Sequence, residues 1–194
     1  MFSTNLAFPP SNQSAINTFK RREILPYKEM TLWRIQTGIV RTFSSTEEGD
    51  IVTLGFWGPG DVVGEALGCI QPYQIECLSE VKACCLKLNK LWQIELDQGW
   101  HINQVMLAHI HQTQELLRIR NGEVAQRVMQ LLHCLAHKFA RPVEGGQVLT
   151  VRLTHQDIAD TVGTSRVTIT RVLNQLAQQG QIQWMRQYLV IPIA

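Results

Sequence analysis

The chain of 194 residues has no apolar run long enough to span a bilayer, and its five cysteines form no Cys-x-x-Cys pair. The first absence argues against a membrane-spanning helix, which needs about 20 consecutive apolar residues. The second argues against a structural zinc site or a disulfide framework. Residues 1–15 have two prolines and no basic start. We therefore expect a flexible tail there, no signal peptide, and a cytoplasmic protein with reduced thiols.

Histidine is absent from residues 16–100, and arginine and lysine are absent from residues 66–81. The first absence removes the imidazoles that a metal-dependent cupin enzyme or a haem would need in this region. The chain also shows no nucleophile–base arrangement typical of covalent catalysis. We therefore expect that the protein is not an enzyme and that it has no metal and no cofactor. The second absence leaves that stretch without a cation for a bound anion.

Charge is distributed unevenly, although the net charge is only +2. Residues 1–114 contain nine Lys and Arg against eleven Asp and Glu, whereas residues 115–194 contain nine against five. A basic C-terminal part favours nucleic acid as a partner, but a solvated helical surface would explain the same modest excess.

The spacing of apolar residues differs between two parts of the chain. Residues 20–90 alternate apolar and polar residues in short runs such as "TLWRIQTGIVRTF", separated by turn signals such as "STEEGD" and "GPGD". Many short strands at regular spacing predict an antiparallel barrel or jelly roll. From about residue 96 to 140 apolar residues recur at helical spacing instead. This pattern predicts one helix over residues 97–120 and a second from Gly122 to about Phe139, ended by "ARPVEGGQ".

The stretch "LTHQDIADTVGTSRVTITRVLNQLAQQGQIQW", residues 153–184, predicts two helices around a tight turn. Thr154 can cap the first helix, with Asp157 placed to complete a capping box. Gly163 makes the turn, and Thr164 or Ser165 caps a second helix that ends at Gly180. The segments "IQW" and "YLVIPI" then predict a two-stranded wing. Helix, turn, helix and wing in this order are typical of a helix-turn-helix DNA-binding domain.

The second of these helices has two sides. Its core stripe consists of Ile169, Val172, Leu173 and Leu176. The opposite side holds Val167, Arg171 and Asn174, with Thr170 beside them and Arg166 in the first turn. Arginine can bind guanine with two hydrogen bonds, hydroxyls suit phosphates, and an apolar side chain can pack on a thymine methyl. This side therefore predicts base reading in double-stranded DNA. The alternative for Val167 is packing against another protein segment.

With these motifs in view, the chain resembles the cyclic-AMP receptor/fumarate-nitrate regulator (Crp/Fnr) superfamily of bacterial transcription factors over about residues 20–194. The motifs are "GPGDVVGEALG" (58–68), "AQRVMQLLHCLA" (125–136) and "LTHQDIADTVGTSRVTITRVLNQL" (153–176). The resemblance implies an α+β protein with a β-roll (jelly-roll) sensor domain of the cyclic-nucleotide-binding type, a long dimerisation helix and a C-terminal winged helix-turn-helix. The corresponding ranges are 1–15 for the tail, 16–96 for the sensor, 97–120 for the dimerisation helix and 121–194 for the DNA-binding domain.

The recognition segment "TSRVTITRVL" is most similar to the cyanobacterial nitrogen-control branch. The cyclic-AMP receptor branch has Glu where this chain has Val167, so we expect a different operator. The resemblance implies a regulator that binds a palindromic operator as a homodimer, with RNA polymerase as a further partner. It implies DNA contacts by Arg166, Thr168 and Arg171. With the residues argued above, the expected DNA-binding set is Thr154, Ser165, Arg166, Val167, Thr168, Thr170, Arg171 and Asn174.

The effector is unknown from the sequence. Gly64 and Glu65 match the part of the family's pocket that binds a ribose hydroxyl, but Glu76 lies where its phosphate-binding cation would fall. We therefore expect no response to cyclic AMP, and expect Glu65 to cap local backbone. Arg118 on the dimerisation helix could face an anion, although solvated surface is the alternative. The iron–sulfur branch is excluded, since residues 1–68 contain no cysteine.

For several side chains the sequence allows both a functional and a structural role. His133 and His137 have the spacing of a metal-binding pair, but such a pair without nearby acids is more often incidental. Cys69 or Cys77 could serve a redox role, with buried inert thiols as the alternative, and Cys84 and Cys85 should point to opposite faces of a strand. A module that keeps the fold without binding DNA is the rival function. We expect the polar residues His109 and Gln112 to interrupt the apolar dimer stripe.

Overall fold

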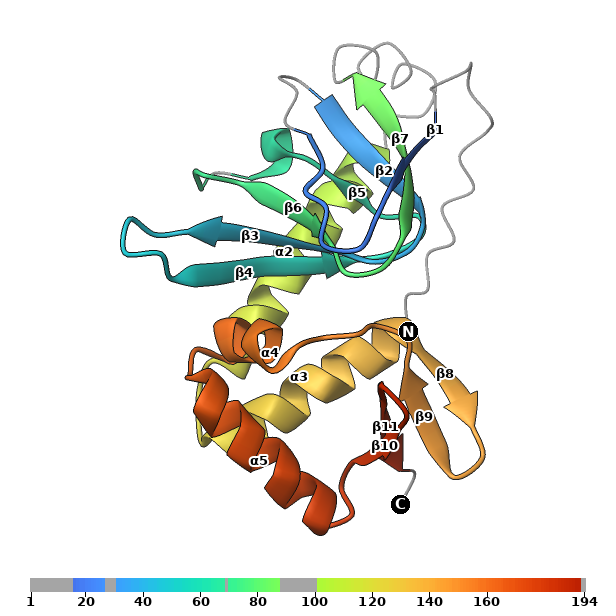
Figure 1. Ribbon diagram of the computed structural model, residues 1–194. Helices are drawn as coiled ribbons and strands as arrows, with labels where there is room; N and C mark the ends of the chain where they lie inside the picture. The colour runs from blue at the N-terminus through green and yellow to red at the C-terminus, as the bar shows by residue number, and fades with distance from the viewer. Residues whose placement is uncertain (1–15, 27–30, 69, 88–100, 193–194) are drawn as a thin grey trace. The chain divides into compact units, whose positions relative to one another are not determined.

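The structure is a computed structural model, and it describes residues 16–26, 31–68, 70–87 and 101–192 (Figure 1). Contacts divide the chain into two compact units, residues 1–44 with 56–110 and residues 45–55 with 111–194. The expected tail over residues 1–15 and the start of the expected dimerisation helix, residues 97–100, lie outside the described residues. The domain boundaries expected from the sequence therefore stay predictions. No described helix is both long and apolar enough to cross a membrane.

The N-terminal part is β-rich, as the alternating pattern predicts. One sheet has the strand order β1-β7-β2-β5, and another has the order β4-β3-β6. The strands are β1 (Ile16–Phe19), β2 (Thr31–Thr37), β3 (Val40–Ser45), β4 (Ile51–Trp57), β5 (Val62–Val63), β6 (Gln74–Cys77) and β7 (Val81–Lys87), with a short 3-10 helix η1 (Glu65–Leu67) after β5. This arrangement confirms the β-roll sensor fold.

The core of the first unit forms because alternate residues of a strand share one face. On β2, Trp33 and Ile35 are buried and lie opposite Cys85 and Ala83 of the antiparallel strand β7. Phe19 meets the Trp33 ring edge-on, with ring centroids 5.4 Å apart. Their packing removes a continuous apolar cluster from water, which is the main source of stability for a unit of this size.

Two long helices follow, close to the expected ranges. Helix α2 spans His101–Ile119 and helix α3 spans Val124–Phe139, with Gly122 between them at φ 94°. A positive φ of this size strains any residue with a Cβ, so glycine suits the corner. The buried side of α3 is Val128, Leu131, Leu132, Leu135, Ala136 and Phe139.

The second unit packs three helices with a four-stranded sheet of order β10-β11-β9-β8 (Figure 1). Its elements after α3 are β8 (Ala140–Val143), β9 (Gly146–Leu149), α4 (His155–Val162), α5 (Arg166–Gln178), β10 (Gln183–Met185) and β11 (Tyr188–Pro192). Strands β10 and β11 confirm the expected wing. Strands β8 and β9 were missed, because "ARPVEGGQ" reads as a helix-ending loop. Pro142 is tolerated since β8 is an edge strand.

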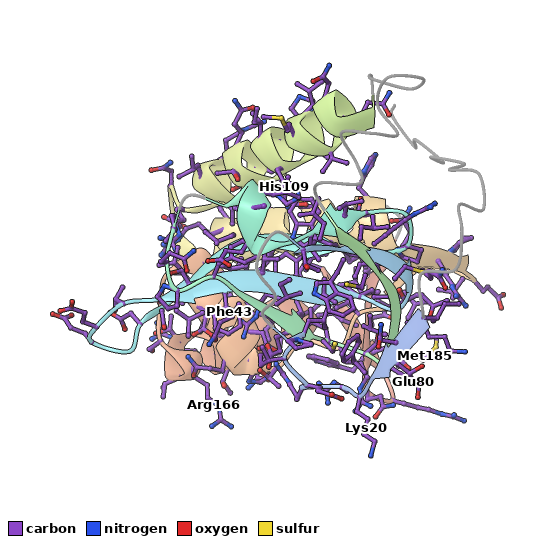
Figure 2. All side chains as sticks on the ribbon, turned by 90° about the horizontal axis from the view of Figure 1, so that it is seen from above. Lys20, Phe43, Glu80, His109, Arg166 and Met185 are labelled. Carbon is purple, nitrogen blue, oxygen red and sulfur yellow. The ribbon has the colours of Figure 1, made fainter. Side chains whose placement is uncertain are left out.

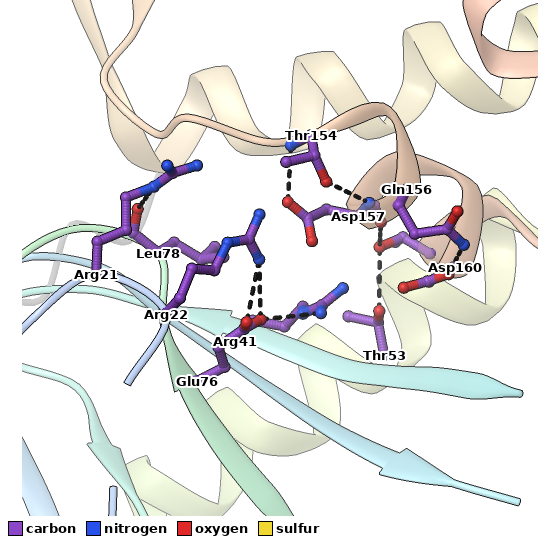
Figure 3. Close-up of polar contacts among 11 residues, drawn as sticks. Arg21, Arg22, Arg41, Thr53, Glu76, Leu78, Thr154, Gln156, Asp157 and Asp160 are labelled. Atoms are coloured by element: carbon purple, nitrogen blue, oxygen red, sulfur yellow. Dashed lines mark hydrogen bonds and ion pairs between the residues drawn. The ribbon is translucent and has the colours of Figure 1, made fainter. Parts of the chain in front are cut away.

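The turn between α4 and α5 forms as the sequence predicts. Thr154 Oγ1 accepts a hydrogen bond from Asp157 N at 3.1 Å, and Asp157 Oδ2 accepts one from Thr154 N at 2.7 Å (Figure 3). This capping box starts α4, and Gly163 ends it in the left-handed region at φ 70° and ψ 60°. Ser165, rather than Thr164, caps α5 by accepting from Thr168 N at 3.2 Å.

Candidate nucleic-acid interface

Helix α5 is anchored by one side and free on the other. The stripe expected to face the core, Ile169, Val172, Leu173 and Leu176, is buried. On the opposite side Arg166, Arg171 and Asn174 are exposed, and Val167 is 79% exposed. An exposure this high argues against the alternative in which Val167 packs on another segment of the described chain. A valine on an otherwise polar outward face is therefore available to an external partner.

The two arginines of this face are available for hydrogen bonding. Neither Arg166 nor Arg171 forms an ion pair with any residue that the structure describes. The Arg166 side chain extends away from the ribbon in Figure 2. Each guanidinium offers five N–H donors in a planar fork, which matches the O6 and N7 acceptors of guanine. Helix α5 thus carries donors for base edges without a carboxylate to neutralise them.

The hydroxyls expected to contact DNA already have local partners. Ser165 Oγ lies 2.9 Å from Thr168 Oγ1 as well as capping α5, and Thr154 serves the capping box of α4. Thr170 Oγ1 donates to Arg166 O at 3.0 Å. Caps and back-bonds of this kind fix the two helices. Arg166, Val167, Arg171 and Asn174 remain as the side chains whose polar or apolar ends have no such local role.

Sequence reasoning missed two residues of this unit. Arg127 of α3 donates from Nη1 to Val162 O at 2.8 Å and so satisfies a carbonyl at the end of α4. His155, the first residue of α4, lies with Nδ1 2.8 Å from Thr170 Oγ1 of α5. No periodicity marks either contact in the sequence, because each joins two helices through one polar side chain.

Within the first unit, a cavity of about 340 Å³ contains Gly64 and Glu65. Its lining residues are Ile24, Leu25, Pro26, Thr31, Trp33, Gly64, Glu65, Gln71, Pro72, Tyr73, Gln74 and Ile75. A Cβ at Gly64 would lie 2.6 Å from Leu32 Cδ2 and 2.7 Å from Thr31 O, so only glycine allows this approach to β2. The described lining contains no Arg or Lys.

The polar groups of the cavity are acidic or neutral. Glu65 accepts a hydrogen bond from Gln71 Nε2, so its partner is a side-chain amide and not the backbone that we expected. Burial raises the pKa of Tyr73 to about 12, which keeps its hydroxyl neutral at physiological pH. An anion would meet a carboxylate here, and no described cation lines the cavity.

Glu76, expected from sequence to replace a phosphate-binding cation, binds cations of its own unit. Its carboxylate pairs with Arg22 Nη1 at 3.1 Å and with Arg41 Nη2 at 2.9 Å (Figure 3). The side chains of Glu76 and Arg41 are only 12% and 6% exposed. Buried pairs of this kind need both partners, since removing one leaves an uncompensated charge. Glu76 is therefore a structural residue of the sensor fold.

Arg118 lies in a different cavity, in the second unit. A groove of about 390 Å³ is lined by Glu115, Arg118, Ile119, Gln130, His133, Cys134 and His137. Arg118 Nη1 is 3.8 Å from Glu115 Oε1, and its side chain is 83% exposed, which fits the solvated alternative. The groove brings an acid, Glu115, to the His133–His137 pair. No set of three described His, Cys, Asp or Glu side chains is arranged to hold a metal ion.

The cysteines of the sensor fold occupy contrasting sites. Cys84 and Cys85 are adjacent on β7, opposite Arg34 and Trp33 of β2 respectively, so they point to opposite faces as expected. Cys85 packs against the core, whereas Cys84 Sγ accepts a hydrogen bond from Gln36 Nε2 at 2.8 Å. Cys77 is buried, and burial raises the pKa of its thiol to about 12. The protonated thiol is the unreactive form.

Helix α2 presents an apolar stripe that no described residue buries. Met106, Ile110 and Leu117 are half-exposed or more, and they fall on one side at 100° per residue. The expected interruption of this stripe by His109 and Gln112 is wrong, because both turn the other way. His109 stacks on Trp57 with ring centroids 4.0 Å apart and Nε2 2.9 Å from Val62 O, and Gln112 is buried.

Comparison with known proteins agrees with both halves of this description. Residues 17–96 match the cyclic nucleotide-binding domain family, and residues 126–192 match the Crp-like helix-turn-helix domain family. The regulatory protein CysR of Synechococcus elongatus is 33% identical over 88% of this chain and 81% of its own length. The global nitrogen regulator of a Nostoc species is 23% identical over 95% of this chain and 86% of its own length.

Solved structures give the same result for the fold. A CRP-family transcriptional regulator from Thermus thermophilus superposes with a TM-score of 0.77 at 23% identity, over 91% of this chain and 92% of that one. A second Thermus thermophilus regulator, described as CRP/FNR family, superposes with a TM-score of 0.68 at 26% identity, over 92% and 94%. Regulators of this kind are not enzymes. The chain belongs to the Crp/Fnr superfamily of transcription regulators, with a helix-turn-helix DNA-binding domain.

Proposed function

We propose that this regulator binds a palindromic operator as a homodimer and reads bases with the outward face of α5. The observation that carries the proposal is the pairing of two unneutralised guanidiniums, Arg166 and Arg171, with a valine that is 79% exposed between them. Arg171 would fork onto a guanine and Val167 would pack on a thymine methyl. Asn174 lies one turn further along the same face. Arg166, in the first turn, is placed for a phosphate or a base edge.

The proposed dimer forms when a second copy of the chain covers the stripe of Met106, Ile110 and Leu117. A single helix-turn-helix makes few contacts, whereas two related by a two-fold axis read half-sites one helical turn apart. The stripe supports this arrangement because it is apolar, lies on one side of α2, and contacts no described residue closely enough to be buried. RNA polymerase would be the second protein partner at the promoter, in the bacterial cytoplasm.

We also propose that cyclic AMP is not the effector. The cavity with Glu65 has a carboxylate but no described cation, and Glu76 is committed to Arg22 and Arg41. A cyclic phosphate would lose the charge-assisted hydrogen bonds that normally offset its desolvation. Whatever ligand the cavity takes would bind without that charge pairing.

Selection from random-sequence DNA tests the proposed function directly. The full chain should enrich a palindrome whose half-sites are about 10 base pairs apart, centre to centre. Sedimentation of the enriched duplex should give two protein chains per duplex. Enrichment of no sequence, or binding as one chain per duplex, would contradict the proposal.

The effector proposal needs its own titration. Calorimetric titration of the full chain with cyclic AMP at its physiological concentration should show no heat of binding. A Glu65→Gln variant, which keeps the shape of the side chain and removes its charge, serves as the comparison. A dissociation constant of micromolar or below for the unmodified chain would overturn the assignment.

A further inference from the structure

The first helix of the DNA-binding motif is tied to the recognition helix by one histidine. His155 Nδ1 lies 2.8 Å from Thr170 Oγ1, and Thr170 Oγ1 donates to Arg166 O at 3.0 Å. His155 and Thr170 are half-buried, and the neighbouring residues Thr154 and Arg171 are exposed. The imidazole is therefore at the edge of the outward face of α5.

The direction of these hydrogen bonds fixes the tautomer of the imidazole. A threonine hydroxyl has one proton, and the Thr170 proton goes to a backbone carbonyl, which can only accept. Thr170 Oγ1 must therefore accept from His155, so Nδ1 carries a proton. In a neutral imidazole with Nδ1–H, the other ring nitrogen, Nε2, is an acceptor. A phosphate oxygen, itself an acceptor, gains nothing from that nitrogen.

Protonation reverses this relation. The imidazolium has an N–H at both nitrogens, so Nδ1 keeps its bond to Thr170 while Nε2 becomes a charged donor. When a recognition helix enters the major groove, the first helix of the motif crosses the sugar–phosphate backbone. His155 begins that first helix, and its position at the edge of the α5 face would bring it to the backbone flanking the groove when α5 binds as proposed.

We propose that His155 is a DNA phosphate contact that forms only with the protonated imidazole, so that operator binding takes up one proton at each half-site. This inference rests on the proposed function. Thr170 then acts as a positioning residue, since its hydroxyl orients the imidazole and leaves Nε2 to the phosphate. The sequence alone placed Thr170 in contact with DNA and did not include His155.

The charges around His155 are consistent with this assignment. On α4 itself Asp157 is buried in the capping box, and Asp160 accepts a hydrogen bond from Gln156 Nε2. On α5 the charged residues are Arg166 and Arg171, and on α3 Arg127 is bound to Val162 O at the far end of α4. The DNA phosphate is then the anion that a protonated His155 meets. Affinity gained in this way is present at low pH and is lost as pH rises.

Fluorescence anisotropy at about pH 6 and about pH 8 tests the proposal. The probes are two short labelled duplexes, one enriched by the protein from random-sequence DNA and one with that sequence scrambled. The full chain should bind both duplexes about tenfold more tightly near pH 6, since phosphate contacts carry no sequence information. The slope of log affinity against log salt should be steeper by about two units near pH 6, one for each half-site.

Four variants isolate the contribution of His155. His155→Gln should lose the pH dependence and the extra salt slope, and His155→Arg should keep tight binding at both pH values. His137→Gln removes an exposed imidazole from α3 and should leave the pH dependence intact. Thr170→Val should weaken the pH dependence of DNA binding. Its melting temperature, compared with that of the unmodified chain, reports any loss of stability.

The outcomes separate the two proposals. Failure of the full chain to bind either duplex at any pH would contradict the proposed function itself. Binding that is tight and unaffected by pH, or a pH dependence that survives in His155→Gln, would overturn the assignment of His155 and leave the operator-binding function standing.

Discussion

The outward face of α5 and the cavity of the sensor unit differ in whether their charged groups have partners within the protein. On α5 the guanidiniums of Arg166 and Arg171 have no ionic partner among the described residues, and Val167 stands exposed between them. In the cavity Glu65 is already bound to Gln71, and the nearby Glu76 is held by two arginines. The donors of the first surface have no ionic partner among the described residues, whereas the carboxylates in and near the cavity already have partners within the protein.

This difference indicates where binding energy is available. Unneutralised donors on an exposed helix gain from meeting phosphates and base edges, and their desolvation is small because they start in water. The Glu65 carboxylate has further acceptor sites beside its bond to Gln71, but acceptor sites suit a donor and not an anion. Hydrogen-bond donors suited to DNA are therefore in place on α5, while the described lining of the cavity offers an anion no cation.

The largest effect should come from removing the proposed dimer contact. Met106→Glu combined with Ile110→Glu should give monomers and weaken operator binding by about a thousandfold, close to the gap between specific and non-specific affinity. Sedimentation velocity and anisotropy measure the two effects. His111→Glu adds the same kind of charge on another exposed side of α2 and should change neither. A dimer that persists in the double variant would move the interface away from this stripe.

A second variant tests whether the sensor unit depends on its internal ion pairs. Glu76→Ala leaves the largely buried Arg41 without its carboxylate and should lower the free energy of unfolding by about 3 kcal/mol. Chemical denaturation followed by tryptophan fluorescence reports this, since Trp33 and Trp57 lie in the core. Glu80→Ala, at an exposed turn, is the control. An unchanged midpoint for Glu76→Ala would mean that the arginines find other partners.

A smaller effect is expected at the capping box of α4. Asp157→Ala removes the carboxylate that accepts from Thr154 N at 2.7 Å and should destabilise the DNA-binding unit by about 1 kcal/mol. Gln156→Ala, an exposed neighbour in the same turn, should cost much less. If both variants unfold at the same denaturant concentration, the box contributes no measurable stability.

Sequence and structure agree most closely where the signal is contiguous. The caps, turn and core stripe of α4 and α5 lie within one short segment, so local periodicity and capping chemistry were enough to place Ser165, Val167 and Arg171. The cavity around Glu65 is assembled from segments distant in the chain, including Trp33 and Tyr73. Its partners therefore could not be read from spacing.

Two errors and one omission have specific physical causes. Helical periodicity assigned His109 to the dimer stripe. The 3.6-residue repeat shows which residues share one side of a helix, but it does not show what that side packs against. The Trp57 ring that stacks on His109 is remote in sequence. The β8 strand was missed because Pro142 indicates a loop, although an edge strand tolerates proline. His155 escaped because the hydrogen bond that reveals it joins two helices.

Base reading by α5 is tested most directly by measuring affinity across a panel of single-base changes in the selected operator. Arg171→Ala should lower affinity by about 1–3 kcal/mol and remove the preference at one symmetric position of each half-site. Val167→Glu should shift preference at the neighbouring position toward a base pair that offers cytosine N4, with little change in melting temperature. Gln175→Ala, exposed on the same helix, should leave preferences unchanged. If Arg171→Ala weakens every operator equally and Val167→Glu changes stability without changing preference, α5 does not read the bases.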